Sequence, residues 1–141
     1  MSLQLPVRSV VVLLGPAARR AAVLAALDPD SARCAGGHAA LGVGRVTAGA
    51  GDGVPARLRT LAAAAGQAVV LVDRLTDGLG TSDRRTVLAA LATLAAAGHT
   101  VLVDDADPVA ALAVAQAALR VPETGRPHLE TALDDLAVPA G

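Results

Sequence analysis

The sequence contains no Phe, Trp or Tyr, and it also lacks Ile, Asn and Lys. Without aromatic side chains it has no platform on which nucleic-acid bases can stack. Without Lys it cannot form a Schiff base, and it lacks the ammonium group that usually grips nucleotide phosphates. Codons for most of the missing residues are AT-rich, so we interpret the composition as the mark of a high-GC bacterium and not of a special function.

The sequence also has few cysteines and a small net charge. The single cysteine, Cys34, excludes an internal disulfide and a cysteine-based zinc cage. A net charge of −1 argues against nucleic-acid binding through bulk electrostatics. The longest early apolar run, residues 7–14, is too short to span a membrane and is interrupted by Arg8. We therefore expect a cytoplasmic domain that neither binds nucleic acid nor inserts into a membrane.

Apolar residues make up 53% of the 141 residues, which is enough for one domain with a core of Leu and Val. Apolar runs alternate with helical patterns along the chain. The expected strands are 7–14, 41–47, 68–72, 100–103 and 118–121. The expected helices are 17–27, 55–65, 82–97, 108–117 and a short amphipathic one at 128–137.

Signals at the helix ends support these assignments. Pro55 suits the first position of one helix, and Ser82 is the expected N-cap of another. The last expected helix has an apolar stripe of Leu129, Leu133 and Leu136. We expect residues 1–125 to form the core and residues 126–141 a C-terminal helix or tail. We favour packing of the stripe on the chain's own core over docking to a partner or second copy.

Strands separated by helices predict a mainly parallel sheet, in which ligands bind beyond the carboxyl ends of the strands. The three clearest strands end at Gly15, Asp73 and Asp104. If these strands are neighbours, a glycine turn and several carboxylates share one edge of the sheet. That edge is the candidate site.

The segment VVLVDRLTDGLGTSDRRTVLAALATLAAAGHTVLVDDADPVAALAVAQAALRV, residues 69–121, resembles the second half of an ABC-transporter ATP-binding domain. The resemblance lies in the order and spacing of an Asp-ended strand, a Gly-Leu loop, a helix and an Ala-Ala-Gly-His-Thr-Val turn. Residues 51–53 stand where the family has its Ser-Gly-Gly signature, although a plain turn before a helix also explains them. At the front, VVVLLGPAARRAAVLAAL resembles the family's strand, phosphate loop and first helix.

The resemblance implies a three-layer α/β fold of the P-loop NTPase type. It also implies that the helical subdomain is missing, because the interval from Gly15 to Asp73 is much shorter than in the family. Asp73 stands at the position of the Walker B aspartate, which helps to hold magnesium. Gly15, Arg19 and Arg20 are what remains at the phosphate loop, and we regard them as a weak relic of a phosphate site.

The departures from the family matter as much as the matches. A phosphate loop needs G-x-x-x-x-G-K-[ST], and Gly15 is followed by neither a second glycine, nor a Lys, nor a hydroxyl. Arg74 replaces the glutamate that activates water, and Ala106 replaces the switch histidine. The Gly-Leu-Asp loop becomes Gly78-Leu79-Gly80. Together these changes remove most of what phosphoryl transfer requires.

Other candidate residues have simpler explanations. Asp104, Asp105 and Asp107 form a hard-cation site with Asp73 under one hypothesis. Under the other, they form a solvated acidic loop in which Asp107 caps the next helix. We expect Arg19-Arg20 and Arg84-Arg85 to lie on solvated helix faces. His38 and His128 have no partner at metal-ligand spacing, His99 belongs to a turn, and Cys34 is expected to be an inert thiol.

The function that we favour from the sequence is a non-hydrolysing, ABC-ATPase-like accessory subunit without a cofactor, or with weak ATP and magnesium binding at most. Its expected partner is a protein, namely a membrane permease, an intact ABC ATPase or a second copy. One alternative is a working ABC-type ATP-binding protein with a divergent phosphate loop. The other is a magnesium-dependent phosphoryl enzyme that uses Asp73 and the aspartates at 104–107.

Overall fold

The computed structural model describes residues 5–27 and 42–131. Its strands are β1 (Val10–Leu14), β2 (Val43–Thr47), β3 (Val69–Asp73), β4 (Thr100–Asp104), β5 (Ala117–Arg120) and β6 (His128–Glu130). Its helices are α1 (Ala17–Leu27), α3 (Val54–Ala63), α4 (Thr81–Ala96) and α5 (Pro108–Leu112).

All six strands form one sheet in the order β2-β3-β4-β1-β5-β6. The first five strands are parallel, and only β6 runs antiparallel to its neighbour β5. The strand β4 lies between β1 and β3, so the three strands that carry the candidate edge are adjacent. Asp73 and Asp104 are register partners at the ends of β3 and β4. The expected shared edge is therefore confirmed.

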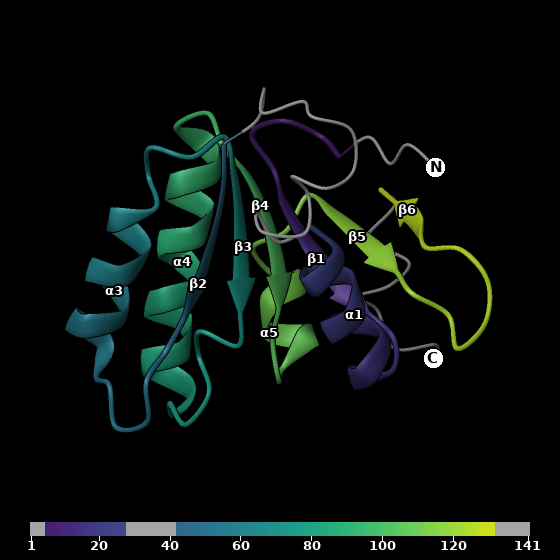
Figure 1. The fold of residues 1–141 in the computed structure, drawn as a ribbon. Helices are drawn as coiled ribbons and strands as arrows, with labels where there is room; N and C mark the ends of the chain where they lie inside the picture. Colours follow the sequence, from purple (N-terminus) through teal and green to yellow (C-terminus); the bar gives the residue numbers. More distant parts are fainter. Residues whose placement is uncertain (1–4, 28–41, 132–141) are drawn as a thin grey trace.

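The sheet is covered on both faces, which gives three layers (Figure 1). One core cluster packs sheet residues such as Val12 and Val103 against α3, α4 and α5. The other packs Leu13 and Leu71 against Leu24 of α1. Buried strands read as continuous Val and Leu runs because both of their faces are covered. The expected α/β fold with a mainly parallel sheet is confirmed.

Most element boundaries fall within a few residues of the expected ones, but α5 is much shorter than the expected helix 108–117. Gln116 explains the early end, because its backbone N–H donates to the carbonyl of Val10 and its side-chain amide oxygen accepts from the N–H of Val10. These bonds draw the chain into the sheet before another helical turn can form. Ser82 is not an N-cap either, because α4 starts at Thr81 after Gly80 and has no side-chain cap.

The expected helix 128–137 is wrong at its start. Residues 128–130 form the edge strand β6, in which Leu129 pairs with Leu119. The Nε of Arg120 also donates to the Glu130 carboxylate at 2.6 Å. Pairing with β5 thus outweighs the local i, i+4 pattern. Leu133 and Leu136, the rest of the expected stripe, lie outside the described residues. Among the described helices, none is long and apolar enough to cross a membrane.

Candidate functional site

The site lies at the carboxyl edge of β3, β4 and β1, where β1 passes directly into α1. Only Gly15 and Pro16 separate the last residue of β1 from the first residue of α1. Gly15 has a φ of +137°, and a Cβ atom there would lie 2.0 Å from the carbonyl oxygen of Val121. Glycine is thus required because the backbone after β5 presses against this turn. The connection provides no loop that could wrap a phosphate chain.

Both arginines of α1 fold back toward the sheet, which corrects the expected solvated face. Arg20 donates from Nε to Oδ1 of Asp104 at 2.8 Å and from Nη1 to the Gly15 carbonyl at 2.6 Å. Arg19 donates to the carbonyls of Pro122 at 3.0 Å and Gly125 at 2.7 Å. The two guanidinium groups therefore fasten α1 to β4 and to the segment after β5.

Asp73 is also paired within the chain. Arg45 of β2 donates to Oδ2 of Asp73 through both Nε, at 3.1 Å, and Nη2. The Asp73 side chain is 19% exposed, and that of Asp104 is 4% exposed. Each of the two carboxylates that end β3 and β4 is thus neutralised by an arginine from a neighbouring element.

Arg74 follows Asp73 in the left-handed region, with a φ of 57°. Its backbone N–H donates to the Asp104 carbonyl at 2.9 Å, and its Nε donates to Oδ2 of Asp77 at 2.8 Å. The hydrogen bond to Asp77 raises the pKa of the Arg74 guanidinium above its usual value. The side chain at this position is therefore a permanent cation that cannot take a proton from water.

The aspartates after β4 hold the acidic loop itself together. The buried Asp105 accepts from the Thr76 hydroxyl at 2.7 Å and from the Asp107 backbone N–H at 2.9 Å. Asp107 accepts from the N–H of Ala110 and so caps α5. Arg84 lies 3.9 Å from both carboxylates, so it too departs from the expected solvated face. Ala106, between them, is exposed.

Within residues 5–27 and 42–131, no three His, Cys, Asp or Glu side chains lie close enough to hold a metal ion. The cation hypothesis for Asp73 and residues 104–107 therefore gains no support, while the expected helix cap at Asp107 is present. The short Gly15 turn and the paired carboxylates do not fit a nucleotide with its magnesium.

A hollow of about 430 Å³ lies between the turn at residues 48–52 and residues 77–79. Arg57 of α3 lines this hollow and is 4% exposed. Its guanidinium donates to the carbonyls of Asp52 at 2.8 Å, Leu75 at 2.9 Å and Asp77 at 2.5 Å. The buried Arg57 guanidinium thus links the turn that contains Asp52 to the loop that contains Asp77 and Gly78.

The remaining histidines have structural surroundings. Nδ1 of His99 lies 2.6 Å from the carbonyl oxygen of Gln67, between two turns. Nε2 of the exposed His128 lies 3.2 Å from Glu130. Cys34 and His38 lie outside the described residues.

Sequence reasoning missed Arg45 and Arg57 as members of this edge. Their positions in a short strand and a helix gave no sign of their partners, because all of these partners except the Asp52 carbonyl lie 18 to 28 positions away. The one available signal was the composition. All twelve basic residues are arginines, and the chain also has thirteen acidic residues. Such a balance favours internal bidentate pairs.

No family model matches the sequence, and no curated protein matches it closely enough to count as a relative. Solved structures do match the fold. The chain superposes on a metal-chelate-type ABC transporter in an inward-facing conformation with a TM-score of 0.63 and 15% identity, covering 93% of this chain and 75% of that one.

Two further structures agree. An ATP-binding cassette in a dimeric post-hydrolysis state, bound to ADP and Pi, gives a TM-score of 0.57 at 13% identity, with 89% and 87% of the two chains covered. A bacterial Atm1-family ABC exporter with ATP bound gives 0.57 at 15% identity, with 96% of this chain covering 36% of that one. At such identities the likeness concerns the fold alone. The chain therefore has the fold of the ATP-binding domains of ABC transporters, reduced to a core around the six-stranded sheet.

Proposed function

We propose that this chain is a non-hydrolysing, ABC-ATPase-like accessory domain that acts by binding a protein. One observation carries the proposal: both carboxylates at the candidate edge are occupied by arginines of the same chain, Asp73 by Arg45 and Asp104 by Arg20. In this proposal the two guanidinium groups take over the charge balance that a divalent cation gives a working nucleotide site. The edge is then neutral without metal.

The surroundings of the Gly15 turn, where a related ATPase would bind phosphate, support the same proposal. Phosphoryl transfer depends almost entirely on positioning and electrostatic stabilisation of the transferring group. The turn at Gly15 is closed by the Val121 carbonyl, and Arg20 is already committed to Asp104. Arg74, at the position of the water-activating glutamate, is paired with Asp77. No side chain in these places is left to grip a γ-phosphate or to activate water.

The solved structures that share this fold support the proposal of a protein partner. They include transporters and a dimeric ATP-binding cassette. By analogy, we propose that this domain associates with a transporter permease, an intact ABC ATPase or a second copy of itself. The analogy rests on the shared fold and selects none of the three.

The test is calorimetric titration of the purified chain with MgATP, together with an assay of phosphate release. We expect affinity no tighter than millimolar and no release above the buffer blank. Asp73→Ala serves as the matched variant, because it removes the one aspartate that the family would use for magnesium. Micromolar binding, or turnover that Asp73→Ala abolishes, would establish a working ATP-binding protein instead.

A metal titration completes the test. Mn²⁺ broadens NMR signals of nuclei close to its binding site. We expect no selective broadening at Asp73 or Asp104 in the wild-type chain. Selective broadening there at micromolar Mn²⁺, lost in Asp73→Ala, would favour the magnesium-dependent phosphoryl enzyme.

A further inference from the structure

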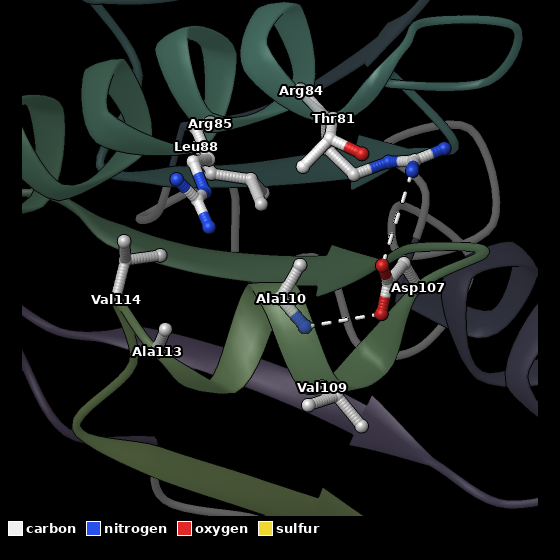
Figure 2. Close-up of a pocket in the computed structure, with 9 residues that line it drawn as sticks. All are labelled: Thr81, Arg84, Arg85, Leu88, Asp107, Val109, Ala110, Ala113 and Val114. Atoms are coloured by element: carbon white, nitrogen blue, oxygen red, sulfur yellow. Dashed lines mark hydrogen bonds and ion pairs between the residues drawn. The ribbon is translucent and has the colours of Figure 1, made fainter.

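An apolar groove of about 490 Å³ lies between α4 and α5; Asp107 of the acidic loop lines it, whereas Asp73 and Asp104 do not. Its floor and walls include Leu88 of α4 together with Val109, Ala113 and Val114 from α5 and the turn after it (Figure 2). Val109 is 71% exposed, one of the two large apolar side chains so exposed in the described residues. A groove of this kind on a small domain favours an apolar occupant.

The charged residues that line the groove are two arginines and one aspartate, Asp107. Arg84 and Arg85 of α4 both line it, and the Arg85 guanidinium lies over the gap between the helices (Figure 2). Arg84 is held by Thr76 and by the carboxylates of Asp105 and Asp107. Arg85, in contrast, has neither a hydrogen bond nor an ion pair with any described residue. The occupant that suits this groove therefore combines apolar side chains with carboxylates.

The chain itself has such a segment immediately after the described residues. Residues 132–141 read ALDDLAVPAG, in which Asp134 and Asp135 stand between Leu133 and Leu136. Within residues 131–141 these two aspartates are the charged side chains, so the segment is acidic as well as apolar. Its composition complements an apolar groove with a free guanidinium at the rim.

The path to the groove is short. Glu130 is the register partner of Ala118, so the described chain ends at Thr131 beside the start of β5. Val114, at one end of the groove, is three residues before Ala117, the first residue of β5. One strand spacing of about 5 Å and three residues of about 3.5 Å each separate these points. Ten further residues span at most about 35 Å, which is ample.

We propose that the C-terminal segment 132–141 docks in the groove between α4 and α5. Leu133 and Leu136 cover the apolar floor, and Asp134 and Asp135 pair with Arg85. This contact is independent of nucleotide binding, so it stands or falls separately from the function proposed above.

The first test uses the full chain with Cys34→Ser and a spin label at Ala137→Cys. Docking broadens the amide signals of Leu88, Ala110 and Val114 in a ¹⁵N-labelled chain. Arg85→Glu reduces the docked fraction, by about two- to fivefold for the loss of one exposed ion pair. Arg59→Glu, which changes an exposed and unpaired arginine on α3, leaves the broadening unchanged.

A charge swap and a mixing experiment complete the test. Asp134→Arg with Asp135→Arg releases the segment, and combining them with Arg85→Glu restores part of the broadening. Broadening that appears only when spin-labelled, isotope-free chain is mixed with ¹⁵N-labelled chain would assign the groove to a second copy. No broadening of groove amides in either arrangement, or broadening unaffected by Arg85→Glu, would also overturn the proposal.

Discussion

Asp73 and Asp104 end neighbouring strands in register, yet each is paired with a different arginine, from β2 and α1 respectively. Two carboxylates at adjacent strand ends would repel each other if both were left ionised in a poorly solvated place. Separate cationic partners remove that repulsion. The sheet edge therefore holds two separate ion pairs, one between β2 and β3 and one between α1 and β4.

The pair between Arg20 and Asp104 should contribute strongly to stability. Arg20→Ala leaves an almost buried carboxylate without its cation, and we expect unfolding free energy to fall by roughly 3 kcal/mol. Urea unfolding followed by far-ultraviolet circular dichroism measures this in a chain without aromatic residues. In a double-mutant cycle with Asp104→Asn, the second change should cost much less once Arg20 is gone. Strictly additive effects would contradict the pairing.

Arg57 should contribute as much to stability, although its hydrogen bonds go to backbone carbonyls and not to carboxylates. Arg57→Met removes a buried guanidinium that donates to three carbonyls, and we expect a loss of about 3 kcal/mol. The control is Arg59→Met, two residues away on the exposed face of the same helix, with an expected effect within about 0.5 kcal/mol. Equal effects of the two substitutions would show that the cross-link has no energetic weight.

Gly15 is expected to tolerate no side chain. Gly15→Ala combines an unfavourable φ with a clash against the Val121 carbonyl, so we expect a loss of roughly 3 kcal/mol or more. Gly66→Ala is the matched control, since a Cβ there meets nothing within 4 Å. We expect that change to leave stability unaltered or to raise it by up to about 1 kcal/mol. Thermal unfolding of both variants measures the difference.

The stability contributed by the pairing of β5 with β6 should fall at acidic pH. The hydrogen bond from Arg120, aided by His128, holds the pKa of Glu130 below its ordinary value of 4.5. A lowered folded-state pKa contributes stability above pH 4.5, and this contribution disappears as pH falls through the folded value. The difference in stability between wild type and Glu130→Gln should therefore shrink below about pH 4.5. In an Arg120→Gln background, the pKa of Glu130 measured by NMR should rise toward 4.5.

The sequence was sufficient to predict the sheet edge, because parallel strands joined by helices bring their carboxyl ends together whatever the details. Gly15, Asp73 and Asp104 follow from that topology alone. The partners of these residues could not be predicted in the same way. The helical pattern placed Arg20 on a solvated face, but its long side chain reaches from the start of α1 to Asp104 of β4. Periodicity describes where a Cα lies and not how far a side chain extends.

The end of the chain illustrates a different limit. Leu129 fits a helical stripe with Leu133 and Leu136, and nothing local argues against it. The strand at 128–130 exists because β5 offers an open edge and because Arg120 stands opposite His128, next to Glu130. Such pairing depends on a strand about ten positions earlier in the chain, which lies outside the few residues that a helical stripe relates to one another.

The two-residue passage from β1 to α1 also bears on protein engineering. Anyone who wishes to rebuild a phosphate-binding loop here must insert residues between Gly15 and Arg19, which pushes Arg19 away from the carbonyls of Pro122 and Gly125. The segment between β5 and β6 would then lose its anchor. A successful graft therefore requires redesigning two stretches of chain about a hundred positions apart, in a single step.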